Sequence, residues 1–395
     1  MIEKLNRKNV LPVIVLSQFA GTSLWFVGNA VLPELKESLH LSQYALSHVT
    51  SAVMLGFIAG TLVFAFFSLA DRFSPVKLFF ICSLLGALSN SSVAWLATDA
   101  TSLFALRFLT GIFIAGIYPV GMKIAADWYD KGLGKALGFL LGALILGTAF
   151  PHLLKNREFD LPWKSVLYFT SIFASVGGVL MILFVGDGPY RKKSGGFQWN
   201  AFAKIFGSKK WRQAAFGYFG HMWELYTFWG FLPVILALYA NNKGIELNIP
   251  LLSFLIIAIG SIGAIAGGYI SRSWGSAKVA STALFVSGLC CFLSPLAYNL
   301  PISLFLFFLF VWGLTVSPDS PQFSNLVAQY APEELRGTAL TIYNSIGFSI
   351  STISLIVIDR IFYSTSFFAQ ENTMLLLGFG ALFGLLSMIK LIRTK

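Results

Sequence analysis

Long runs of apolar residues, separated by short polar segments, recur along the whole 395-residue chain. A helix needs about 20 predominantly apolar residues to cross the hydrocarbon core of a bilayer. We expect such spans over residues 10–33, 47–70, 76–97, 102–125, 134–154, 163–185, 213–239, 250–272, 277–298, 302–328, 338–361 and 372–392. The pattern predicts an all-α polytopic membrane protein with twelve transmembrane helices.

The longest polar stretch, residues 186–214, separates the twelve spans into two sets of six. Its glycine, serine and lysine clusters are typical of a loop. We therefore expect an N-terminal six-helix bundle over 1–185, a cytoplasmic central loop over 186–212 and a C-terminal six-helix bundle over 213–395.

The two sets of spans resemble each other in sequence. LADRFSPVK ends the second span and ISRSWGSAK the eighth, while AADWYDKGLGKAL follows the fourth and VAQYAPEELRGTAL the tenth. Leu32-Pro33 closes the first span as Leu232-Pro233 closes the seventh. Three matches in one order at a nearly constant offset indicate a duplication. Parallel repeats of this kind place a solute site between the two halves.

Two of these segments carry a resemblance to a known family, the major facilitator superfamily. Its loop signature Gly-x-Leu-Ala-Asp-Arg-x-Gly-Arg-Lys appears as FSLADRFSPVK, matching at 69–72, and its Arg-x-x-x-Gly signature appears as RFLTG, with Arg107 and Gly111. The PEELRG loop after the tenth span is also of the family type. The resemblance covers nearly the whole chain and implies two bundles related by a pseudo-two-fold axis that move a solute by alternating access.

Composition supports a membrane protein and disfavours a nucleic-acid partner. Hydrophobic residues make up 56% of the chain and charged residues only 11%, against about 25% charged in an average soluble domain. The net charge of +11 arises mostly on the side that carries both termini and the central loop. By the positive-inside rule that side is cytoplasmic. We expect a multi-pass protein of the cytoplasmic membrane with both termini inside.

Two carboxylates inside predicted spans are the strongest sign of mechanism. Glu224 lies near the middle of its span, with His221 three residues before it on the same helical face. This spacing lets the imidazole share a proton with the carboxylate, as a proton-coupled carrier requires. A purely structural pair of the same two residues is the alternative.

Asp319 lies between Pro318 and Pro321, which interrupt the tenth span. Broken helices at membrane depth are tolerated where they line a cavity. We expect Asp319 to carry protons together with Glu224 and His221. Capping of the broken helix without titration is the alternative role.

In the first half, Arg107 is the main basic side chain inside a span. A guanidinium suits a carboxylate or phosphate on a solute, but an acid within the protein could equally hold it. The first span carries a polar and aromatic stripe at helical spacing. The expected solute-binding residues are Gln18, Thr22, Trp25, Asn29, Arg107, Tyr118, Trp223, Tyr226, Gln322 and Asn344, with Tyr343 as a further candidate.

The family resemblance also implies a gate and a sliding surface. Asp71 and Arg72 match the cytoplasmic gate, where Ser74 and Pro75 replace the usual Gly-Arg and predict a weaker latch. Small residues let helices approach closely. The resemblance implies that spans 5 and 8, which carry such residues at Gly134, Gly138 and Gly142 and at Gly260, Gly263 and Gly267, meet across the two halves.

Three hypotheses for function remain. The first is a proton-coupled secondary transporter of a small polar or anionic organic solute, and the second is a proton-antiport exporter of drugs or lipophilic cationic metabolites. The third is a receptor or assembly factor on the same fold that has lost transport. An enzyme is disfavoured, because we find no nucleophile–base pair, phosphate-binding loop or metal-ligand spacing. We expect no cofactor, no metal and a monomer.

Overall fold

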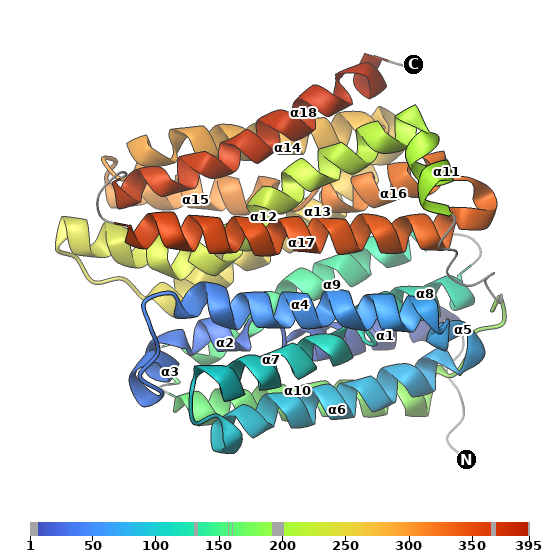
Figure 1. Cartoon of the computed structure of the whole chain (residues 1–395), viewed down its shortest axis with the longest axis horizontal. Coiled ribbons are helices and arrows are strands. Elements are labelled where there is room, and N and C mark those ends of the chain that lie inside the picture. Colours follow the sequence, from blue (N-terminus) through green and yellow to red (C-terminus); the bar gives the residue numbers. More distant parts are fainter. Residues whose placement is uncertain are drawn as a thin grey trace. The chain divides into compact units, whose positions relative to one another are not determined.

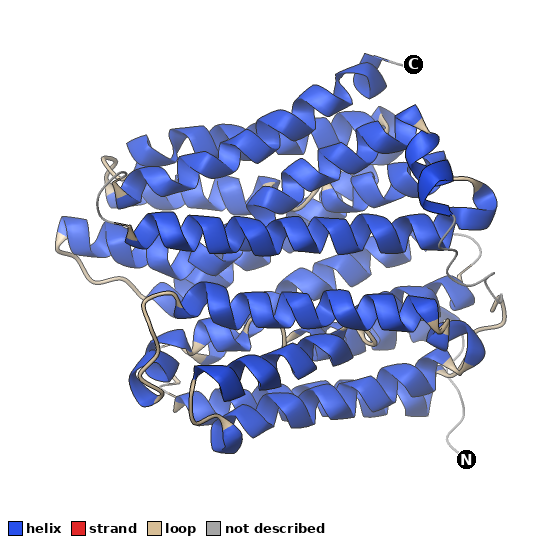
Figure 2. Cartoon of the chain, viewed as in Figure 1, coloured by secondary structure: helices blue, strands red, loops and turns tan. Residues whose placement is uncertain are grey.

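The computed structural model describes residues 7–129, 133–156, 158–159, 161–191, 201–364 and 369–393. Within these ranges the chain is helical and contains no β-strand (Figures 1 and 2), which confirms the predicted all-α class. The chain divides into two compact units, residues 1–197 and 198–395.

The described helices follow the predicted spans in each unit. The first unit contains α1 (Arg7–Thr22), α2 (Val27–Ala30), α3 (Leu32–Ser38), α4 (Ala45–Phe66), α5 (Leu69–Arg72), α6 (Pro75–Leu96), α7 (Ala100–Ile114), α8 (Tyr118–Trp128), α9 (Leu133–Leu154), α10 (Trp163–Leu180) and the π-helical turn η1 (Met181–Val185). The second unit contains α11 (Ala201–Gly207), α12 (Lys209–Lys243), α13 (Ile249–Trp274), α14 (Ser276–Ala297), α15 (Ile302–Thr315), α16 (Ser320–Tyr330), α17 (Arg336–Tyr363), α18 (Gly378–Arg393) and the 3₁₀ turns η2 (Glu333–Leu335) and η3 (Gln370–Leu377).

Among the described residues, eleven helical segments are long and apolar enough to cross a membrane. They match the predicted spans 2 to 12. The first predicted span differs, because its apolar helix Val10–Thr22 is followed by the short α2 and α3 rather than continuing to Pro33. The protein is therefore a multi-pass membrane protein whose first span is broken.

The fourth and tenth spans are broken at matching places. The fourth consists of α7 and α8, and α8 carries Pro119 in its first turn. The tenth consists of α15 and α16, and α16 carries Pro321 in its first turn. Proline fits the first turn of a helix because it has no N–H to donate. The two halves thus share a proline break in the same span.

The glycines of span 8 pack closely against other helices of the second unit. A methyl group on Gly263 would lie 2.1 Å from the carbonyl oxygen of Leu314, and one on Gly267 would lie 3.0 Å from Pro318. This face of α13 packs against α15 and the break of span 10, within the second unit. Tight backbone packing inside one bundle explains these glycines, and the contact of spans 5 and 8 across the halves stays a prediction.

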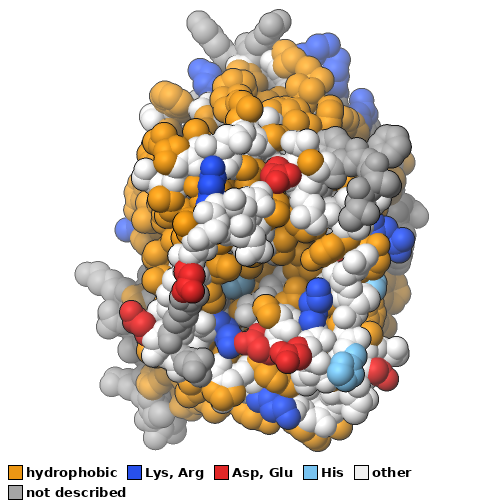
Figure 3. Space-filling model, turned by 90° about the vertical axis from the view of Figure 1, so that its left-hand side faces the viewer, with side chains coloured by type: hydrophobic (Ala, Val, Ile, Leu, Met, Phe, Trp, Pro, Cys, Tyr) orange, Lys and Arg blue, Asp and Glu red, His pale blue; other side chains and the backbone are white. Residues whose placement is uncertain are grey.

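Large apolar side chains are exposed along the long helices. Figure 3 views the helix ends at the left of Figure 1, where charged side chains are scattered among hydrophobic ones. Along the helices, Leu88, Ile172, Phe307 and Leu386 are each more than half exposed. A bilayer accepts such side chains, whereas water does not. This surface agrees with helices that contact lipid.

Candidate functional site

A buried polar cluster lies inside the second unit, and four helices build it. α12 supplies His221 and Glu224, α14 supplies Ser287, α15 supplies Trp312, and the start of α16 supplies Asp319. All five side chains are essentially inaccessible to solvent. The structure therefore brings together the three residues predicted to carry protons.

Glu224 is held by two hydrogen-bond donors that sequence reasoning did not identify. The indole Nε1 of Trp312 donates to Oε1 at 2.7 Å, and the hydroxyl of Ser287 donates to Oε2 at 3.0 Å. Short hydrogen bonds from neutral donors to a carboxylate are among the stronger ones in proteins. They offset part of the cost of burying the charge.

His221 pairs with Asp319 rather than with Glu224. Nδ1 of His221 lies 3.0 Å from Oδ2 of Asp319, within ion-pair distance. Asp319 occupies the N-cap position of α16, but its side chain makes no capping hydrogen bond. The break of span 10 therefore aims the carboxylate at α12. The expected direct pairing of His221 with Glu224 is corrected, because the two side chains find separate partners.

The cluster contains two acids and one imidazole, so its charge depends on how many protons it holds. With both carboxylates ionised, a protonated His221 leaves one negative charge in the interior. A buried charge is costly unless it is paired or neutralised. Binding one proton makes the group neutral.

Serines of α17 fasten α12 beside the cluster. The hydroxyl of Ser351 donates to the carbonyl of Met222, and that of Ser354 donates to the carbonyl of Trp223 at 2.6 Å. Thr227 in turn donates to Ser354 at 3.0 Å. These bonds fix the height and rotation of α12, and with them the positions of His221 and Glu224.

Tyr218 connects two of the other candidates in this unit. Its ring stacks on Tyr343 with centroids 3.8 Å apart, and its hydroxyl donates to Oδ1 of Asn344 at 3.3 Å. The ring also lies 5.8 Å from that of His221. Tyr218 therefore contacts both Tyr343 and Asn344 and lies beside His221. Gln322 is buried on α16, three residues after Asp319.

Trp223 and Tyr226 lie apart from this pair. The indole of Trp223 donates to the carbonyl of Leu376 in η3 at 3.1 Å, so it faces η3 and α18. Tyr226 packs edge-on against Trp229 at 5.4 Å and against Phe348 at 5.1 Å. Both read as packing residues of the second unit, and Trp223 is not brought to the acidic cluster.

Arg107 is the buried cation of the first unit. Its Nη1 donates to Oδ1 of Asn90 at 2.9 Å, and its Nη2 donates to the carbonyls of Leu24 at 3.1 Å and Trp25 at 2.6 Å. Those carbonyls are free to accept because α1 has ended at Thr22. The break of the first span thus builds the seat of Arg107.

No carboxylate among the described residues neutralises Arg107. Its hydrogen-bond partners among these residues are all neutral, and its Nε bonds to none of them. Asn90 is itself held by Leu167, Thr170 and Ser171 of α10. The guanidinium is therefore positioned firmly and carries an uncompensated positive charge.

The polar stripe of the first span does not form one continuous face. Gln18 packs closely against Gly121 of α8, and Thr22 packs closely against Gly147 of α9. A methyl group on either glycine would lie 2.1 Å from a side-chain oxygen of its neighbour in α1. Beyond the break, Trp25 packs on Phe57 and Asn29 donates to Thr50 at 2.8 Å, both in α4. All four stripe residues are buried.

Gln18 differs from the rest of the stripe. Neither polar atom of its side chain bonds to any described residue, although the side chain is fully buried. Tyr118, at the start of α8, is partly exposed. A buried amide without a protein partner marks a place for another polar group.

Charged residues tie together the ends of α5, α8 and the segment after η1. Lys123 lies 3.0 Å from Asp71 and 3.5 Å from Asp127. Arg191 donates to the carbonyls of Asp71 and Phe73. Asp71 is therefore part of an ion-pair network, whereas Arg72 is exposed, and the gating role of both residues stays a prediction.

Ser74 has two roles at this network. It caps α6 by accepting from Lys77 N, and it donates to Asp187 at 2.7 Å. Asp187 also lies 3.3 Å from Arg191. The replacement of glycine by serine thus adds a hydrogen bond here rather than only removing a turn residue.

Several residues of these networks were missed from the sequence. Ser287 and Trp312 look like ordinary span residues, and Asn90 carries no motif. Lys123 and Asp127 are spaced four apart in a helix and could have been recognised as an ion pair. The others become visible only through contacts between helices distant in sequence.

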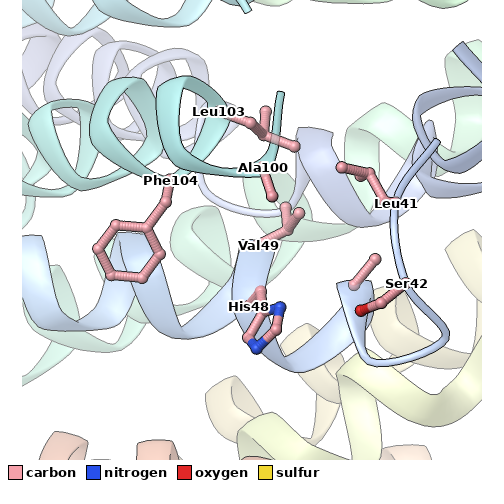
Figure 4. Close-up of a pocket in the computed structure, with 8 residues that line it drawn as sticks. Leu41, Ser42, His48, Val49, Ala100, Leu103 and Phe104 are labelled. Carbon is pink, nitrogen blue, oxygen red and sulfur yellow. The ribbon is translucent and has the colours of Figure 1, made fainter. Parts of the chain in front are cut away.

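A small pocket of the first unit lies at the start of α4 and α7 (Figure 4), lined by Leu41, Ser42, Ala45, His48, Val49, Ala100, Leu103 and Phe104. Its volume of 20 Å³ is close to the space of one water molecule. It is too small for an organic solute. Among the described residues, no group of three or more His, Cys, Asp or Glu side chains is arranged to hold a metal ion.

Two curated proteins match part of the chain. The inner membrane metabolite transport protein YgcS of Escherichia coli (strain K12) is 30% identical over 123 residues, 31% of this chain and 26% of that protein. The glycerol-3-phosphate transporter of Bacillus subtilis (strain 168) is 24% identical over 188 residues, 44% of this chain and 42% of that protein. The chain spans less than half the length of these curated relatives.

Solved structures of transporters match nearly the whole chain. The xylose transporter XylE of E. coli has a TM-score of 0.76 at 13% identity, covering 98% of this chain and 100% of that one. The human organic anion transporter MFSD10 has a TM-score of 0.75 at 15% identity, with 98% and 100% coverage. At these identities the likeness shows the fold alone.

The family profile described as Major Facilitator Superfamily matches residues 14–355. With the helical fold, this match places the chain among transporters rather than enzymes. The chain belongs to the Major Facilitator Superfamily.

Proposed function

We propose that this protein is a proton-coupled secondary active transporter that moves a small polar or anionic organic solute by alternating access. The observation that carries the proposal is the fully buried group of His221, Glu224 and Asp319, with Nδ1 of His221 3.0 Å from the Asp319 carboxylate. A carboxylate in a span costs on the order of 2.5–3.5 kcal/mol even on lenient insertion scales. We therefore infer that the two carboxylates serve a function that depends on their charge.

We assign proton binding as that function. Binding one proton to the cluster removes a net charge from the interior of the second unit, so the packing of α12, α14, α15 and α16 responds to proton binding. Glu224 and Asp319 are the proton carriers in this proposal, and His221 is the ion-pair partner of Asp319.

Arg107 supports a solute that is anionic or strongly polar. It is a buried cation whose protein partners are neutral. A solute carboxylate or phosphate near it supplies the missing negative charge. Gln18, a buried amide with no partner among the described residues, is the second contact we assign to the solute. The Bacillus relative carries an anion in its name, glycerol-3-phosphate, which agrees with this class.

An exporter of lipophilic cations is the alternative. Its support is the aromatic wall beside Glu224, where Trp312 stacks on Phe228 with centroids 4.3 Å apart. Aromatic faces and an acid attract a cation. This alternative leaves Arg107 without a task, so we prefer the first proposal.

We further propose that the protein acts as a monomer in the cytoplasmic membrane with both termini inside. The distribution of lysine and arginine in the sequence supports this orientation. The two internal six-span repeats make a single chain sufficient for alternating access.

The experiment has two stages. Thermal stabilisation of the purified protein by a charge-sorted library of organic solutes, at mildly acidic and at neutral pH, identifies the solute class. The hit is then loaded into liposomes with a pH gradient, and its accumulation is measured for wild type and Glu224→Gln. The proposal is supported if the hits are anionic or polar and if the wild-type protein accumulates them only when the pH gradient is present. Cationic hits, or accumulation that ignores the gradient, contradict it.

A further inference from the structure

The two oxygens of Glu224 have unlike partners. We propose that Trp312 and Ser287 are positioning residues that assign different tasks to them: Oε1 remains a hydrogen-bond acceptor, and Oε2 takes up and releases the proton. The inference rests on the proposed proton coupling, because it names the atom at which the proton binds.

Oε1 faces a group that only donates. The indole N–H of Trp312 has no acceptor capacity and lies 2.7 Å away. The indole ring is fully buried and is held by Phe228 and Phe308, with centroids 4.3 and 5.8 Å away. It cannot turn aside, so a proton on Oε1 would meet another donor hydrogen. Protonation at this oxygen is therefore unfavourable.

Oε2 faces a group that both donates and accepts. The Ser287 hydroxyl donates to Oε2 of Glu224 at 3.0 Å. Oγ of Ser287 also lies 3.4 Å from the carbonyl oxygen of Leu284. When a proton from water binds Oε2, the new O–H donates to Oγ of Ser287, whose own hydrogen turns to the Leu284 carbonyl. Every polar group keeps a partner in both states, so neither state carries the penalty of an unsatisfied buried group.

The remaining titratable groups around Glu224 do not offer this exchange. On α12 itself His221 is engaged by Asp319, which is the group that faces Glu224 from the start of α16. From α14, Cys290 and Cys291 face the carboxylate, and the Cys291 thiol contacts it. A thiol is only a weak donor and a weak acceptor. Ser287 is thus the switching partner.

Infrared spectroscopy tests the inference without any solute. The carbonyl stretch of a protonated carboxylic acid is followed during a pH titration of the whole purified protein in lipid, and the band of Glu224 is the one lost in Glu224→Gln. The variants are Trp312→Phe, Ser287→Ala and Ser287→Thr. Ser294→Ala is the matched control, because Ser294 is also buried on α14 and donates to the Cys291 carbonyl in its own helix.

Trp312→Phe removes a donor whose hydrogen bond is stronger to the ionised carboxylate than to the carbonyl oxygen of the protonated acid. We expect the midpoint of the Glu224 band to rise by about one pH unit, the difference between a hydrogen bond to a charged group and one to a neutral group. Ser287→Ala removes a partner from both forms, so we expect a smaller midpoint change together with a shifted band frequency. Ser287→Thr restores the frequency, and Ser294→Ala changes neither quantity.

Two results overturn the inference. One is a Trp312→Phe midpoint that equals wild type, and the other is a Ser287→Ala midpoint that rises as far as that of Trp312→Phe with no change in frequency. Failure of the proposed function looks different. In that case the Glu224 band titrates as described, but solute accumulation in liposomes ignores the pH gradient.

Discussion

The fourth span of the first unit and the tenth span of the second are built alike but carry opposite chemistry. Each is broken before a first-turn proline, Pro119 in α8 and Pro321 in α16. The residue two positions before that proline is the buried Ile117 in one case and the buried Asp319 in the other. The break supplies a place in the fold, and the side chain at that place decides its use.

The difference extends to the whole of each unit. The first unit buries a cation, Arg107, among neutral partners, and the second brings the buried Glu224, Asp319 and His221 into one cluster. A duplicated chain has thus kept its backbone geometry while its two halves diverged in charge. We therefore propose that solute recognition belongs to the first unit and proton binding to the second.

The largest expected effect concerns the cation. Arg107→Lys keeps the charge but cannot donate to Asn90, Leu24 and Trp25 together. Since a hydrogen bond from a charged group contributes about 1.5–3 kcal/mol, we expect solute affinity to fall roughly ten- to hundredfold. The measurement is a binding titration with the solute found in the liposome experiment. Equal affinity in Arg107→Lys and wild type would remove Arg107 from the solute site.

The next prediction tests whether the two units share one packing scheme. A methyl group on Gly111 would lie 2.1 Å from the Val53 carbonyl in the first unit, and one on Gly263 would lie 2.1 Å from the Leu314 carbonyl in the second. Overpacking of this kind costs about 1–3 kcal/mol, so either Gly→Ala change should lower the thermal unfolding temperature. Gly268→Ala on the same α13 meets nothing within 4 Å and should leave it unchanged. Equal unfolding temperatures of Gly263→Ala and Gly268→Ala would contradict this packing.

A smaller effect on stability is expected from the ion pairs of Lys123 in the first unit, compared with the matching position in the second unit. Lys123 pairs with Asp71 and Asp127, whereas the repeat places Asn325 at the matching position, where it donates to Ser276. We expect Lys123→Asn to lower stability by about 1 kcal/mol or less, an effect that salt reduces. Thermal unfolding at low and high salt measures it. A loss that salt leaves intact would mean that Lys123 acts through packing instead.

The smallest effect concerns the starts of the fourth and tenth spans. The carboxylate of Asp99 caps α7 by accepting a hydrogen bond from the backbone N–H of Ser102. This bond holds the pKa of Asp99 below its ordinary value. Because the folded pKa is lowered, this contribution to stability is present above the unfolded pKa and is lost as pH falls through the folded one. The tenth span begins after Pro301, which has no titratable group. Asp99→Asn should therefore remove a slight acid sensitivity of unfolding, while Pro301→Ala should not change it.

Hydropathy predicted the spans because the bilayer requires long apolar segments whatever their partners are. It placed Glu224 and Asp319 within spans, and the prolines revealed the break of the tenth. The break of the first span was not predicted, because its helix ends at Thr22 without a proline at that point. There the end is stabilised by Arg107, which lies far along the chain.

The pairing of side chains could not be predicted in the same way. His221 and Glu224 share a helical face, and that spacing alone favours a direct interaction. The structure gives His221 to Asp319 and Glu224 to Trp312, because neighbouring helices bring better-placed partners. Trp223 was assigned to the solute for its aromatic character, but the rotation of α12 turns it to η3. Rotation and pairing depend on contacts between helices, which periodicity does not encode.

The division of labour is tested most directly by measuring solute and proton fluxes together, in the same liposomes, for Glu224→Gln and Arg107→Lys. Glutamine keeps an acceptor for Trp312 and resembles the protonated acid. The account predicts that Glu224→Gln still exchanges solute across the membrane but moves fewer protons with each solute molecule than wild type does, because only Asp319 remains as a carrier. Arg107→Lys needs far more solute yet keeps the wild-type ratio of protons to solute. A wild-type ratio of protons to solute in Glu224→Gln, or a changed ratio in Arg107→Lys, would contradict the assignment of the two tasks to the two units.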